Sequence, residues 1–72
     1  MIQVSYDPKA DALYIRLRHA KVDESDEVSA GVIVDYDHKG KPIGVEVLDA
    51  SRLLGGRPNL QVELAPITSS KR

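Results

Sequence analysis

Apolar and polar residues alternate near the start of the chain in a way that predicts two short strands. The apolar positions of the first are Ile2, Val4 and Tyr6, and those of the second are Leu13, Ile15 and Leu17. A period of two is typical of a strand with one buried face. The link between them contains Asp7 and Pro8, which favour a tight turn. We therefore expect an antiparallel hairpin here.

The middle of the chain predicts a second hairpin. Residues 19–27 have the composition of an acidic loop, residues 28–37 form an apolar strand, and residues 43–48 form the strand that returns. Asp37 and Gly40 occupy the first and fourth positions of a type I turn. Without a bulge, Val32, Val34 and Tyr36 share a face with Val45, Ile43 and Lys41. A bulge at Gly40 shifts this register by one residue, and the sequence leaves both registers open.

The last third predicts one short helix and a C-terminal extension. Asp49 is the expected N-cap of a helix over residues 50–54, which Gly55 and Gly56 end. We expect one domain over residues 1–56 and an extension over 57–72, with a strand at 60–64 and a frayed tail at 66–72. The predicted fold class is α+β and mainly β: an antiparallel sheet of four or five strands, built from two hairpins, with one short helix.

One six-residue pattern occurs twice. Residues 4–9 and residues 34–39 both read Val-x-Tyr-Asp-x-Lys, and in both the Tyr-Asp pair precedes an expected turn. We interpret the repeat as one turn chemistry used by two hairpins, since an Asp side chain bonds readily to the amides that follow it.

The composition of the chain disfavours or excludes several classes of function. The chain has 72 residues, with ten basic and eleven acidic side chains and no cysteine. The near balance of charge disfavours non-specific nucleic-acid binding, and the missing cysteines exclude disulfides and thiolate chemistry. No apolar run could span a bilayer, and the N-terminus lacks the pattern of a signal peptide, so we expect a cytoplasmic protein without a membrane partner. A chain this small, without Phe or Trp, is also expected to form a homo-oligomer.

Two groups of carboxylates are candidates for metal or acid–base chemistry. Asp35, Asp37 and Glu46 stand at positions 1, 3 and 12 of an EF-hand register, with Gly40 at position 6. Lys39 at position 5 and the strand-like flanks argue against calcium. The second group consists of Asp7, Asp11, Asp35, Asp37 and His38. Because Asp at turns ordinarily bonds to backbone amides, we expect no catalytic residue and no cofactor.

Other residues are candidates for an interaction surface. Tyr14, Arg16 and Arg18 alternate along one predicted strand, and Tyr and Arg are enriched in protein interfaces. The same side chains on an open sheet could stack on single-stranded RNA, although an ordinary solvated face explains them better. Leu60, Val62 and Leu64 alternate in the extension and could add a strand to this sheet or to a partner's edge.

Two stretches resemble a family of small prokaryotic proteins, the domain of unknown function 2283. The first is Tyr6-Asp7-Pro8-Lys9-Ala10-Asp11-Ala12-Leu13-Tyr14-Ile15-Arg16-Leu17. The second is Gly31-Val32-Ile33-Val34-Asp35-Tyr36-Asp37, followed by Gly40 and by Gly44-Val45-Glu46-Val47-Leu48-Asp49-Ala50-Ser51. The resemblance spans residues 4–54 and implies an antiparallel sheet with a short helix, and no assigned catalytic residue. Relatives beside small toxin-like genes imply an antitoxin-like role as one function.

Three functions follow as expectations. The first is a non-catalytic interaction module that associates with itself through sheet edges or a sheet face. The alternative is an antitoxin-like partner of a small basic toxin or nuclease, for which the acidic residues 23–27 would provide attraction. The third is a small metal-dependent enzyme that uses the turn carboxylates.

Overall fold

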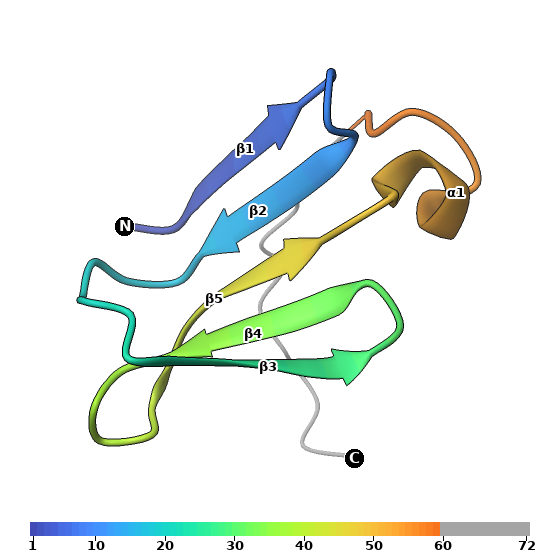
Figure 1. The fold of residues 1–72 in the computed structure, drawn as a ribbon. Helices are drawn as coiled ribbons and strands as arrows, with labels where there is room; N and C mark the ends of the chain where they lie inside the picture. Colours follow the sequence, from blue (N-terminus) through green and yellow to red (C-terminus); the bar gives the residue numbers. More distant parts are fainter. Residues whose placement is uncertain (60–72) are drawn as a thin grey trace, which may run out of the picture.

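The computed structural model describes residues 1–59, which form five strands and one helix. The elements are β1 (Gln3–Asp7), β2 (Ala12–Arg16), β3 (Glu24–Ser29), β4 (Val32–Tyr36), β5 (Pro42–Val47) and α1 (Ala50–Leu54). Figure 1 shows one twisted sheet with α1 beyond the end of β5. The expected α+β, mainly β fold is confirmed.

All neighbouring strands of the sheet are antiparallel, in the order β1-β2-β5-β4-β3. Tight turns join β1 to β2, β3 to β4 and β4 to β5 (Figure 1). The β2–β5 pairing unites the N-terminal hairpin with the rest of the chain, through Leu13 opposite Val47 and Ile15 opposite Val45. The two free edges of the described sheet are therefore β1 and β3.

A loop was expected over residues 19–27, and this prediction is wrong for residues 24–27, which belong to a strand. Strand β3 begins at Glu24 and pairs with β4, with Asp26 opposite Val34. The strand predicted over residues 28–37 is instead interrupted by a turn at Ala30 and Gly31, where Gly31 adopts a φ of 77°. All six residues of β3 are exposed, so this edge strand forms by backbone pairing and needs no apolar alternation.

The β4–β5 hairpin contains a bulge at its turn and one register shift within its strands. Gly40 has a φ of 79°, and Tyr36 lies opposite Pro42, as a G1 bulge at the turn requires. The register then shifts between Tyr36 and Asp35, so that Val34 pairs with Val45 and not with Ile43. The structure thus settles the open register in favour of the bulge at Gly40 and adds an irregularity that the sequence did not indicate.

The buried core lies on the sheet face against which the start of α1 packs. Leu13, Val47 and Ala50 form one buried cluster, with Tyr6 and Val45 packed against it. Ile43 is also fully buried. Cross-strand pairing places Val4, Ile15, Val45 and Val34 side by side on this same face. We call these four side chains the valine-rich row.

Asp49 occupies the N-cap position of α1, as expected, but without a side-chain cap, and the helix end at Gly55 is confirmed. Asp49 has a left-handed φ of 54°, and its side chain makes no cap hydrogen bond. At the other end Gly55 has a φ of 79°, and the Gly56 amide donates to the Ser51 carbonyl at 2.6 Å. The start of α1 must therefore be capped by a residue from elsewhere in the chain.

Candidate functional site

Asp11, in the β1–β2 turn, caps the start of α1. The Ser51 amide lies 3.1 Å from both carboxylate oxygens of Asp11, and the Ser51 hydroxyl donates to Oδ2 at 2.6 Å. The Ala50 amide donates to the Asp11 carbonyl at 2.9 Å. One residue thus satisfies two of the amides that a helix leaves free at its start.

Tyr6 and Arg57 extend this contact. The Tyr6 hydroxyl donates to Asp11 Oδ1 at 2.6 Å, and Arg57 Nη1 lies 3.5 Å from the Tyr6 oxygen. Hydrogen bonds from Ser51 and Tyr6 lower the pKa of Asp11, and the bond to the Asp11 carboxylate raises the pKa of Tyr6. Tyr6 is therefore held protonated and Asp11 ionised at neutral pH, which suits a structural clamp.

Asp11 also sits in a left-handed conformation, with a φ of 52°. Asp tolerates this region because its short side chain can bond locally. We call Tyr6, Asp11 and Ser51 the Tyr6–Asp11–Ser51 clamp. The sequence shows that each of these residues has a side chain able to form such hydrogen bonds. It does not show that they converge, because Asp11 and Ser51 lie 40 positions apart.

A second polar network lies on the opposite face of the sheet. The Tyr14 hydroxyl donates to Asp35 Oδ2 at 3.1 Å, and the Ser25 hydroxyl donates to Asp35 Oδ1 at 2.6 Å. The Arg16 guanidinium lies 5.4 Å from the centre of the Tyr14 ring, a cation–π distance. Burial, followed by the bond to Asp35, raises the pKa of Tyr14. Tyr14 and Arg16 therefore form one surface with Asp35 and Ser25.

Arg18 does not belong to that surface. It lies beyond the end of β2, where both the Leu17 and the Arg18 amides approach the Ile43 carbonyl, at 2.7 and 3.3 Å. Its guanidinium pairs with Asp37. That bond is the main cause that lowers the pKa of Asp37 to about 2, and the amides of Lys41 and Lys39 contribute.

The two copies of the repeated Val-x-Tyr-Asp-x-Lys pattern use the same bond. The Lys9 amide donates to Asp7 Oδ1 at 3.0 Å, and the Lys39 amide donates to Asp37 Oδ1 at 2.9 Å. The interpretation of the repeat as shared turn chemistry is confirmed. Asp7 and Asp37 are thus accounted for as turn residues.

The candidate metal ligands do not converge. Asp35 bonds to Tyr14 and Ser25, Asp37 bonds to its own turn and Arg18, and Glu46 lies opposite Tyr14 and Ile33. Within residues 1–59 no three His, Asp or Glu side chains are grouped so that they could hold a metal ion. Each of these carboxylates therefore has its own interaction partners and is not grouped with the others.

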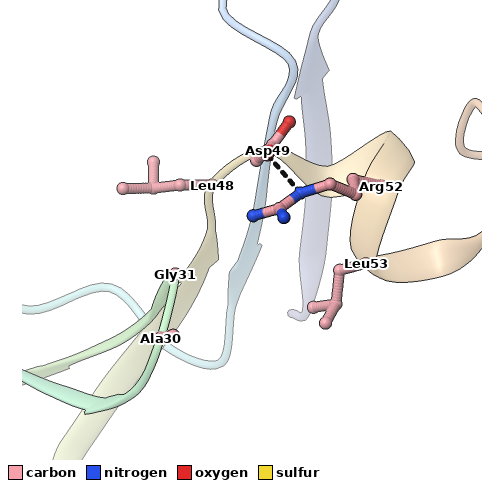
Figure 2. A pocket seen from close by; sticks show the side chains of 6 residues that line it. All are labelled: Ala30, Gly31, Leu48, Asp49, Arg52 and Leu53. Atoms are coloured by element: carbon pink, nitrogen blue, oxygen red, sulfur yellow. Dashed lines mark hydrogen bonds and ion pairs between the residues drawn. The ribbon is translucent and has the colours of Figure 1, made fainter.

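A shallow hollow of about 400 Å³ lies between the β3–β4 turn and α1. Figure 2 shows Ala30 and Gly31 on one side of it and Arg52 and Leu53 on the other. Arg52 Nε lies 2.7 Å from Asp49 Oδ2. This ion pair is exposed, since the Arg52 side chain retains 84% of its accessible surface. The two charged residues that line the hollow, Asp49 and Arg52, are therefore paired with each other at the surface.

Two further observations bear on function. Leu60, Val62 and Leu64 lie outside the described residues, so their expected role in an interface stays a prediction. No helix in the described part of the chain has both the length and the apolar character needed to cross a membrane.

A family model matches most of the chain. The family described as "Protein of unknown function (DUF2283)" matches residues 3–51, which include all five strands and the start of α1. The matched range contains the whole Tyr6–Asp11–Ser51 clamp. Neither the curated proteins nor the solved structures contain a match.

Proposed function

We propose, from the premise that the chain belongs to the DUF2283 family of proteins of unknown function, that it is a non-catalytic interaction module that associates with copies of itself. The family description assigns no activity, so the proposal comes from this chain's own surfaces. One observation carries it: the apolar sheet face is only partly buried in a single chain.

The partial burial follows from the size of the helix. Leu13, Ile43, Val47 and Ala50 are the buried apolar side chains of the described residues. Ile15, Val34 and Val45 of the valine-rich row are only half-buried, and Val4 keeps 38% of its accessible surface. A five-residue helix is too short to cover a five-stranded sheet. A second copy would supply the missing apolar contact, at about 25 cal/mol for each Å² removed from water.

The carboxylates support the non-catalytic part of the proposal. Asp7, Asp11 and Asp37 each bond to backbone amides near them or at the start of α1, and Asp35 bonds to two hydroxyls. General acid–base or metal chemistry needs such groups to converge in one desolvated pocket. Here each carboxylate has a separate structural partner.

Light scattering coupled to gel filtration tests the proposal directly. We expect the full chain to elute as a discrete oligomer at micromolar concentration and to dissociate on dilution. A folded monomer over the whole concentration range would contradict the proposal. A thermal melt at each concentration is the second readout, because a self-associating protein melts at a higher temperature when it is more concentrated.

One observation favours a second candidate, an antitoxin-like partner of a basic toxin or nuclease. The edge strand β3 is exposed along its whole length and carries Glu24, Asp26 and Glu27. An acidic free edge attracts a basic strand and can accept it by backbone pairing. Co-expression with the product of an adjacent basic reading frame tests this: the two should co-purify, and the complex should weaken when these three acids are neutralised.

A further inference from the structure

The two free edges of the sheet differ in charge. Strand β3 carries three acidic residues among six, and strand β1 carries only Asp7 among five. Among residues 1–59 neither edge has a further strand beside it, so the backbone amides and carbonyls along its outer side make each edge a template for another strand. Their different charges determine which edge can pair with its own copy.

Strand β3 is poorly suited to pair with β3 of a second copy. In an antiparallel pair of identical strands, each register that joins five or six residues of β3 sets an acid opposite an acid. The opposed residues are Asp26 and Asp26, Asp26 and Glu27, or Glu27 and Glu27, depending on the register. Like charges directly opposite one another destabilise a sheet. Its charges therefore protect β3 against a second copy.

Strand β1 has no such conflict. If all five residues pair with a second β1, Gln3 lies opposite Asp7, Val4 lies opposite Tyr6, and Ser5 lies opposite its own copy. No like charges meet in this register. The exposed N-terminal residues Met1 and Ile2, at 93% and 64% of their accessible surface, flank this edge with further apolar area.

The same pairing extends the apolar face. Antiparallel neighbours in one sheet are related by a two-fold axis perpendicular to it, so equivalent faces stay on the same side. Val4 begins the valine-rich row at the β1 edge. In this register Val4 lies opposite Tyr6 of the second copy, so the valine-rich row of one copy would continue into Tyr6 and Leu13 of the other, on the same face of the joined sheet.

We propose that β1 pairs antiparallel with β1 of a second copy about a two-fold axis at Ser5, which joins two chains into one ten-stranded sheet. This inference rests on the proposed self-association and specifies its surface. Pairing of β1 with β3 of another copy would instead leave one free edge of each kind and produce an open chain. The β1–β1 contact uses the same strand twice and closes as a dimer.

A single engineered cysteine tests the interface, because the natural chain contains none. In the Ser5→Cys variant the two sulfurs face each other across the two-fold axis, where opposite Cα atoms are about 4.5–5.5 Å apart and within disulfide range. We expect mild oxidation to produce a covalent dimer. Ser29→Cys, at the end of the exposed β3 edge, is the matched control and should cross-link several-fold more slowly.

A charge at the same position provides the second test. Ser5 is exposed, so Ser5→Lys should fold normally while two lysines face each other in the dimer. We expect the dimer dissociation constant to rise several-fold, with a smaller effect at high salt, and Ser5→Gln to leave the dimer unchanged. Light scattering over a dilution series measures both.

The results separate the inference from the proposed function. A dimeric natural chain whose Ser5→Cys variant cross-links no faster than Ser29→Cys overturns the β1 interface but leaves self-association in place. A natural chain that stays monomeric overturns both. Faster cross-linking at Ser5, together with dissociation of Ser5→Lys, supports the interface.

Discussion

Glycine is required at position 44 because neighbouring atoms leave no room for a side chain, and not because of its backbone angles. A Cβ atom added there would clash with the Tyr14 hydroxyl oxygen and would lie 2.9 Å from the Ile15 carbonyl oxygen. Tyr14 leans across this position to reach Asp35, which lies directly opposite Gly44 in the sheet. The missing side chain therefore makes room for the polar network on the open face.

We predict that Gly44→Ala destabilises the protein by about 1–3 kcal/mol, as overpacking typically does. The cost should fall in a Tyr14→Ala background, where only the approach to the Ile15 carbonyl remains. Urea unfolding of the two single variants and the double variant gives the coupling energy. A cost that is the same in both backgrounds would show that Tyr14 does not occupy the space above Gly44.

At the scale of elements, α1 is fixed to the sheet by a residue from the first hairpin. Asp11 supplies both the carboxylate and the carbonyl that accept the first helical amides, and Tyr6 holds the carboxylate from its other side. Asp49 occupies the N-cap position, but its carboxylate caps no helix amide and instead accepts a hydrogen bond from the exposed Arg52 side chain. Asp11 thus links the first hairpin to the helix that packs against the buried core.

We predict that Asp11→Asn lowers the urea midpoint at pH 7, whereas Asp49→Asn stays within about 0.5 kcal/mol of the natural chain. Asn keeps the size of the side chain and tolerates a positive φ, so each substitution tests the charge. Asp49 is the matched control because it also has a positive φ. Equal effects of the two substitutions would contradict a cap supplied by Asp11.

The pH dependence gives a second readout for Asp11. Its pKa is lowered in the folded protein. The ionised carboxylate therefore contributes stability that is fully present above the unfolded pKa of about 3.9 and is lost as the pH falls through the folded pKa. The difference in urea midpoint between the natural chain and Asp11→Asn should narrow as the pH falls below about 4. A difference that is constant down to pH 2 would assign the effect to shape instead of charge.

The sequence pattern predicted those strands and turns that are determined by residues close together along the chain. Alternation identified β1 and β2, and the turn residues Asp37 and Gly40 located the hairpin from which β5 returns. Strand β3 was missed because its residues face solvent and leave no apolar period. The cap from Asp11 was missed because it depends on the order of strands in the sheet, and spacing along the chain contains no signal for it.

For the whole molecule, the placement of charge matters more than its total. The net charge is −1, which alone predicts little. The acids of β3 lie along one free edge, while the opposite edge is nearly uncharged. A sheet with one protected and one permissive edge can associate in pairs without continuing into a longer assembly.

We predict that Glu24→Gln combined with Asp26→Asn converts a discrete dimer into larger species. Without these charges, β3 becomes a second template, and β1–β3 or β3–β3 pairing can propagate from chain to chain. Light scattering should show a mass that grows with concentration beyond that of the natural chain. Glu46→Gln with Asp49→Asn removes the same charge away from the β3 edge and should keep the natural mass. If both double variants match the natural chain, the acids of β3 do not limit assembly, and a different property must stop it at that edge.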